Sequence, residues 1–96
     1  MKPAETLELH RVAVRRVIEA HHGRNPRLFG SVARGDDREG SDIDILIEPT
    51  PETTLMDIGA MRCELRVLLG LPVDILTPGA LSDKFRAQVL AQAVPL

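Results

Sequence analysis

The feature that most constrains the fold is an alternating segment at residues 42–48, Asp-Ile-Asp-Ile-Leu-Ile-Glu. Successive side chains of a β-strand point to opposite faces of the sheet. The three isoleucines of the segment therefore share one face, and Asp42, Asp44 and Leu46 share the other. An isolated strand cannot bury its own apolar face. We therefore expect a β-sheet with two carboxylates on the face opposite the isoleucines.

Helical and extended patterns flank this strand on both sides. We expect helices at residues 4–22, 31–35, 54–69 and 82–93, and strands at 27–30, 42–48 and 72–77. Thr54, with Asp57 three residues later, resembles a capping box at a helix start. Residues 36–41 are all polar or glycine and are expected to form an exposed loop. This order of elements predicts one sheet with helices packed against it.

The side chains of two helices can also be assigned from their spacing. Cys63 shares a helix face with apolar neighbours, which favours a small core residue, whereas Arg66 belongs to a charged run expected to be solvated. In the last helix, Phe85, Val89 and Leu90 are expected to form the apolar side.

Composition narrows the class of protein. The 96 residues leave room for one domain, residues 1–96. Twelve Lys and Arg against fourteen Asp and Glu give a net charge of −2, and two Phe are the only aromatic residues. A protein that binds nucleic acid directly normally has a basic excess or aromatic stacking residues, so we expect no such partner. The single cysteine and the lack of a long apolar run predict a cytoplasmic domain without a membrane span.

The residues with the clearest chemistry begin at the end of the first expected strand. Gly30 and Ser31 follow that strand and open a short helical turn. Free backbone N–H groups at such a turn favour a phosphate, and glycine lets the backbone come close to it. The Ser31 hydroxyl adds a donor, and Arg34 offers a planar cation to the same anion.

A pair of carboxylates follows eleven residues after the serine. Asp42 and Asp44 lie on one strand face and should repel each other, which raises a carboxyl pKa unless a cation lies between them. Mg²⁺ is the fitting ion, because it binds hard oxygen ligands and uses one or two carboxylates together with substrate phosphates. Asp74, alone in an apolar strand pattern, is the candidate for a third acid that holds a second metal or accepts a proton.

The segments FGSVARG and SDIDILI, with VDIL downstream, closely resemble the minimal nucleotidyltransferases, small members of the DNA polymerase β-like superfamily. Gly30, Ser31, Asp42, Asp44 and Asp74 match the five positions of the superfamily pattern. The resemblance implies an α/β (α+β) fold of the polymerase palm type, with a small mixed sheet and flanking helices. It also implies that Asp42 and Asp44 bind Mg²⁺, with Asp74 as the third acid, and that Gly30 and Ser31 hold a triphosphate.

The same resemblance implies an activity and a partner. The expected reaction is metal-dependent transfer of AMP from ATP to a hydroxyl of a partner protein. Proteins of this kind usually act as antitoxins to a HEPN-domain RNase toxin encoded beside them, with which the chain could form an oligomer. The alternative is an inactive binding module that neutralises the toxin by occlusion. A small-molecule nucleotidyltransferase is less compatible, because such enzymes carry an added helical domain for the acceptor.

Overall fold

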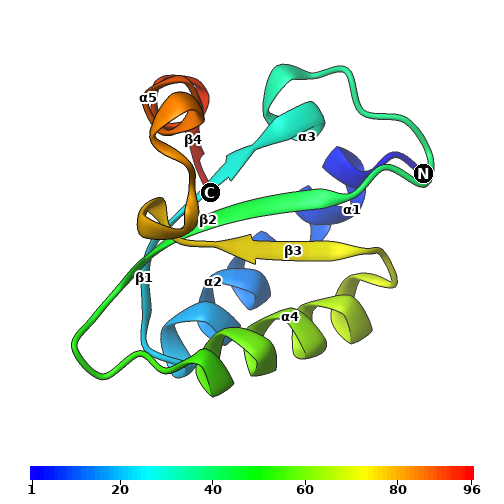
Figure 1. Cartoon of the computed structure of the whole chain (residues 1–96). Coiled ribbons are helices and arrows are strands. Elements are labelled where there is room, and N and C mark those ends of the chain that lie inside the picture. Colours follow the sequence, from blue (N-terminus) through cyan, green and yellow to red (C-terminus); the bar gives the residue numbers. More distant parts are fainter.

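Four strands form one mixed sheet in the computed structural model, which describes residues 1–96. The strands are β1 (Gly23–Phe29), β2 (Ile43–Pro49), β3 (Val73–Leu76) and β4 (Val94–Pro95), in the spatial order β3-β2-β1-β4. β1 is antiparallel to both β2 and β4, whereas β2 and β3 are parallel. The predicted mixed sheet with flanking helices is confirmed (Figure 1).

Five α-helices and one short 3-10 helix pack around this sheet. They are α1 (Pro3–Leu9), α2 (Arg11–Ala20), α3 (Gly30–Arg34), α4 (Leu55–Leu69), η1 (Pro78–Ala80) and α5 (Asp83–Gln92). Figure 1 shows α2 and α4 below the sheet and α3 and α5 above it. No helix in the structure has both the length and the hydropathy that a membrane span needs.

The core lies between the sheet and the helices α1, α2 and α4. The isoleucines of β2 are fully buried there, as their alternation predicts. Val73 and Ile75 of β3 add to the same layer, and Met61 and Leu65 of α4 cover it. Asp44 and Asp74 therefore project from the opposite face of the sheet, because they alternate with these core residues. Leu46 shares their face and is also buried.

The N-terminal half of the chain differs from the sequence-based prediction in two ways. The helix expected at 4–22 is two helices, because the His10 backbone (φ −118°, ψ 15°) leaves the helical region. The first strand begins at Gly23 rather than at residue 27. It accommodates Pro26 where the register with β2 shifts between Arg24 and Arg27, which is where a residue without an N–H is tolerated.

The C-terminal residues form a strand that the sequence did not predict. β4 pairs with β1 through Arg27 with Pro95 and Leu28 with Val94, and the Leu96 N–H donates to the Pro26 carbonyl at 3.0 Å. Two residues are too short for an alternating pattern, so this strand depends on the pairing with β1 that the fold provides.

The sequence-based prediction of which side chains are buried is wrong in part for α4 and α5. Cys63 is exposed, because α4 buries Met61, Leu65 and Leu69 instead. The capping box is confirmed: the Asp57 N–H donates to Thr54 Oγ1 at 3.1 Å, and the Thr54 N–H donates to Asp57 Oδ2 at 2.9 Å.

The last helix buries none of its residues, and Phe85 is 53% exposed. The spacing predicts Phe85, Val89 and Leu90 as its apolar side, but α5 leaves Phe85 and Leu90 exposed and Val89 only partly buried. Its apolar residues are therefore available for other contacts.

The loop at residues 36–41 is not wholly exposed, which corrects a further expectation. Asp37 is only 6% exposed, and its Oδ2 accepts from the Ala4 N–H at 2.9 Å. Ala4 lies in the first turn of α1, where backbone N–H groups have no partner inside the helix. Asp37 therefore caps α1 from a loop 33 residues away.

Asp37→Ala should lower the free energy of unfolding by about 1–2 kcal/mol, because it removes a buried cap and leaves the N–H unpaired. Urea denaturation followed by circular dichroism measures the loss. Asp36→Ala is the matched control, since Asp36 is exposed and makes only a surface ion pair. Equal effects of the two substitutions would contradict the capping role.

Candidate active site

Side chains from three strands form a row across the face of the sheet opposite the isoleucines. Asp44 on β2 is in register with Phe29 on β1 and with Asp74 on β3. Asp42 precedes the first residue of β2 and shares the face of Asp44. Neighbouring strands lie about 4.8 Å apart, so the structure brings the three predicted carboxylates close together. We call Asp42, Asp44 and Asp74 the acid row. Their roles in catalysis stay predictions.

The Asp44 carboxylate lies in an electrostatically unfavourable environment. It is half-buried, and its pKa is raised above the ordinary value, first by burial and then by the negative charges of Asp74 and Asp42. Arg34 acts in the opposite direction but does not compensate. An ionised Asp44 thus needs a cation nearby, as the sequence-based argument expects.

The chemistry of the donors fits Mg²⁺. No group of three or more His, Cys, Asp or Glu side chains in the structure is arranged to hold a metal ion. Mg²⁺ does not require one, because it typically uses one or two carboxylates and completes its octahedron with substrate phosphates and water. Asp42 and Asp44, on one strand face and within electrostatic reach of each other, are the pair that could hold it.

Asp74 has a partner that the sequence analysis treated as solvated. Arg66 of α4 lies with Nη2 3.7 Å from Asp74 Oδ1, and its Nε donates to the Val73 carbonyl at 3.1 Å. Both side chains are about half exposed, at 48% and 50%. The order of the elements could have predicted this pair. Because α4 ends shortly before β3 begins, a long side chain in the last turn of α4 reaches the start of that strand.

Gly30 lies against Asp44, which changes the reason for expecting glycine there. Its φ is +75°, and a Cβ at this position would collide with Asp44 Oδ2. The sequence suggested that glycine makes room for a phosphate; in the structure it makes room for a carboxylate. Ser31 follows, half-buried in the first turn of α3. Gly30 and Ser31 thus lie beside the acid row.

Arg34 is exposed and is not committed to a buried contact. Its Nε lies 3.4 Å from Asp36 Oδ2, and both side chains are at least half exposed. Arg34 also lines a cleft of about 280 Å³, which we call the α3–α5 cleft. Its lining residues are Phe29, Gly30, Arg34, Phe85, Gln88, Val89 and Gln92. The cleft was missed from the sequence, because its two sides are some 50 residues apart along the chain.

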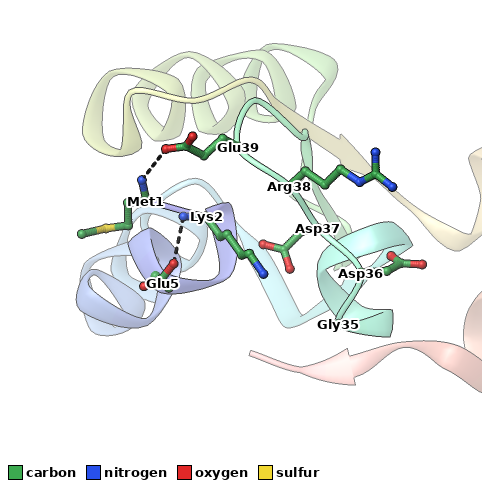
Figure 2. Close-up of a pocket in the computed structure, with 8 residues that line it drawn as sticks. All are labelled: Met1, Lys2, Glu5, Gly35, Asp36, Asp37, Arg38 and Glu39. Atoms are coloured by element: carbon green, nitrogen blue, oxygen red, sulfur yellow. Dashed lines mark hydrogen bonds and ion pairs between the residues drawn. The ribbon is translucent and has the colours of Figure 1, made fainter.

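A second hollow lies away from the predicted site residues. It has a volume of about 640 Å³ and lies between Met1, Lys2 and Glu5 on one side and residues 35–39 on the other (Figure 2). Figure 2 shows the N-terminal amino group paired with Glu39, at 2.8 Å. None of the predicted site residues lines this hollow. Its charged groups serve to hold the loop to α1.

Comparison with known proteins shows the family of this chain. The model of the nucleotidyltransferase domain family matches residues 13–96, a range that includes every predicted site residue. The chain belongs to that family. It is therefore a nucleotidyltransferase, with the fold that the resemblance implied.

Two relatives and two solved structures are informative. A Methanocaldococcus jannaschii protein named as a protein adenylyltransferase is 35% identical over 78 residues, 81% of this chain and 84% of that one. The protein adenylyltransferase MntA of Thermococcus cleftensis is 34% identical over 67 residues, 70% of this chain and 68% of that one. A structure described as a minimal nucleotidyltransferase has a TM-score of 0.87 and 42% identity, and the match covers 97% of this chain and 95% of that one. A toxin–antitoxin crystal structure with AMP-PNP shares the fold, with a TM-score of 0.73 at 21% identity over 85% of this chain and 68% of that one.

Gly30→Ala should destabilise the protein more than Gly35→Ala does. Both glycines have positive φ, +75° and +77°, but only a Cβ at Gly30 meets another group. The shared backbone strain costs about 1–2 kcal/mol, and the clash with Asp44 adds to it only at Gly30. Chemical denaturation of the two variants measures the difference.

Asp44→Ala should rescue Gly30→Ala, because the Asp44 Cβ that remains would lie at an ordinary 3.5 Å from the new methyl group. The double-mutant cycle then gives a favourable coupling between the two substitutions. Additive effects would show that the carboxylate is not what excludes a side chain at Gly30.

Asp44→Asn should raise the melting temperature in metal-free buffer at pH 7. A carboxyl whose pKa is raised in the folded state binds more protons folded than unfolded, so its ionisation opposes folding as the pH rises. The gain should be at most about 1 kcal/mol, since the group is partly solvated, and it should vanish as the pH falls well below about 3.9, the ordinary Asp pKa, where the carboxyl is neutral in both the folded and the unfolded state. Asp42→Asn, at an exposed carboxylate, is the control and should change stability less. A melting temperature lowered by Asp44→Asn at pH 7 would contradict the strain at this position.

Proposed function

We propose that this nucleotidyltransferase transfers AMP from ATP to a hydroxyl of a partner protein, as the antitoxin of a pair with a HEPN-type toxin. The observation that carries the proposal is the register of Asp44 with Asp74 beside Gly30, within a chain similar to proteins named protein adenylyltransferases. We propose further that residues 1–96 act as one domain in the cytoplasm.

The reaction is an in-line displacement at the α-phosphorus of ATP. The acceptor oxygen forms a bond to that phosphorus, the bond from the phosphorus to the bridging oxygen breaks, and pyrophosphate leaves with the bond electrons. In this proposal Gly30, Ser31 and Arg34 hold the triphosphate, and Asp74 accepts the proton of the attacking hydroxyl. Bound at Asp42 and Asp44, Mg²⁺ would neutralise charge on the phosphate oxygens.

Arg66 has a positioning role in this scheme. Its two contacts, to the Val73 carbonyl and to Asp74, hold the Asp74 carboxylate at the edge strand of the sheet. An exposed ion pair contributes little to stability, so its main effect is to restrict where the carboxylate lies. A base restricted in this way is ready for an acceptor that arrives from outside the chain.

The accessibility of the acids supports a protein acceptor. Asp42 is exposed and the Asp74 side chain is 50% exposed, so a hydroxyl presented by a second protein can reach both. Chains in crystal structures of the toxin–antitoxin pair MntA–HepT share the fold of this chain. The occlusion alternative gives no reason to keep three mutually repelling carboxylates together.

Transfer is tested with α-labelled ATP, Mg²⁺ and a HEPN-type protein encoded beside this chain. The wild type should label the partner, and chelation of the metal should stop it. Asp42→Asn and Asp44→Asn should abolish labelling, and Asp74→Asn should slow it by about 10²–10⁴, the usual contribution of a general base. Asp83→Asn, at a carboxylate 94% exposed on α5, is the control and should label normally.

A toxin-neutralisation experiment distinguishes AMP transfer from occlusion. If transfer neutralises the toxin, the three active-site variants should fail to protect cells that express it. If these variants bind the toxin and still protect, occlusion is the function and the transfer hypothesis is wrong.

A further inference from the structure

The α3–α5 cleft gathers residue types that are rare in this chain. The protein has two phenylalanines and no other aromatic residue, and Phe29 and Phe85 both line the cleft. It also has two glutamines, and Gln88 and Gln92 both line the same cleft. Two planar apolar surfaces and two neutral amides therefore converge on one small space, although they come from β1 and α5.

This cleft lies next to the three carboxylates, with Gly30 as the residue common to both. Gly30 lines the cleft and lies against the Asp44 carboxylate, and it has no side chain of its own to fill the space between them. Phe29, in register with Asp44, forms the same boundary from β1. Arg34 also lines the cleft and acts electrostatically on Asp44. A molecule with phosphates at the acid row could thus extend directly into the cleft.

The cleft residues of α5 have unused binding capacity. Gln88 and Gln92 lie one turn apart on the same side of the helix, and no hydrogen bond within the protein involves either side chain. Phe85 is 53% exposed, with Lys84 Nζ 5.7 Å from its ring centroid. Since α5 buries none of its residues, the packing of the helix does not account for an aromatic side chain here.

The size of the cleft restricts its occupant. About 280 Å³ lies just below the volume range of typical small-molecule sites, roughly 300–1,000 Å³. It suits a nucleobase with part of its ribose, and it is too small for a helix of a partner protein. Amide side chains recognise adenine by donating to N7 and accepting from the N6 amino group, and aromatic rings stack on any base.

We propose that the α3–α5 cleft binds the nucleobase of the nucleotide substrate, with Phe29 and Phe85 against the base and Gln88 and Gln92 on the edge of an adenine. The proposal rests on the triphosphate site described under the proposed function. It adds the residues that determine base preference, all on one face of α5 and the end of β1.

Side-chain amide resonances test the proposal directly, because the chain has two glutamines and one asparagine, Asn25. In ¹H–¹⁵N spectra, titration with ATP and Mg²⁺ should shift both glutamine NH₂ pairs, and inorganic triphosphate with Mg²⁺ should not. Asn25, on the exposed part of β1, should not respond to either and serves as the internal control. CTP should shift the glutamine amides less than ATP does.

Binding by the variants provides the second measurement. Phe85→Ala should weaken ATP binding about tenfold, within the range for base–aromatic stacking, and leave triphosphate binding unchanged. The double variant Gln88→Ala/Gln92→Ala should abolish the preference for ATP over CTP. Leu90→Ala is the matched control, since Leu90 lies on the same helix outside the cleft.

The outcomes separate this inference from the proposed function. If the protein binds triphosphate and ATP equally and the glutamine amides do not move, the cleft does not hold the base, whereas the triphosphate site stands. If neither ligand binds at millimolar concentration, the triphosphate site fails and the inference fails with it. Glutamine shifts that appear only when the partner protein is added would also overturn it, because the cleft would then be a protein contact.

Discussion

The parallel pairing of β2 with β3 puts Asp44 and Asp74 side by side, and the other features of the site accommodate that pairing. Two carboxylates on adjacent strands repel each other, and burial of Asp44 increases the cost of its charge. The core on the opposite face fixes the register, because a slip of one residue would turn the isoleucines of β2 towards solvent. The hydrophobic core thus provides the free energy that holds the acids together.

The glycine beside Asp44 is a second consequence of the same pairing. β1 ends at Phe29, in register with Asp44, so the next residue must turn away from the sheet within contact of that carboxylate. Only a residue without Cβ fits, and the positive φ of Gly30 also starts the turn into α3. The contact connects the first turn of α3 with the acid row, so the two parts of the candidate active site lie next to each other.

Sequence alone predicts the parts of this protein whose signal is local. The alternation of isoleucines predicts β2 and the shared face of Asp42 and Asp44, and the Thr54–Asp57 pair predicts the start of α4. Asp74 is a candidate third acid because it stands alone in an apolar strand pattern, and the structure brings it into register with Asp44, although its role stays a prediction. The predictions of β2 and of the start of α4 succeed because strand period and capping chemistry involve residues only a few positions apart.

The features that sequence analysis missed depend on contacts between different elements of the fold. Asp37 looks like any polar loop residue until α1 supplies an N–H for it to cap. Arg66 looks like a solvated residue until the turn after α4 returns the chain to Val73. β4 has no pattern of its own and needs β1. In each case the partner belongs to a different element of the fold, so the periodicity within one helix or strand does not reveal it.

The arrangement of α5 shows how an exposed helix can still be held in a defined position. At its N-terminal end, Arg86 donates to the Pro78 carbonyl at 2.9 Å and to the Leu81 carbonyl at 2.8 Å. At its C-terminal end the chain enters β4, and Leu96 is buried in the core. Because both ends are fixed, the helix does not need to bury its own side chains to stay in place. Its apolar and amide groups can therefore face the α3–α5 cleft without a cost to folding, which is the condition for a binding surface on a chain with so small a core.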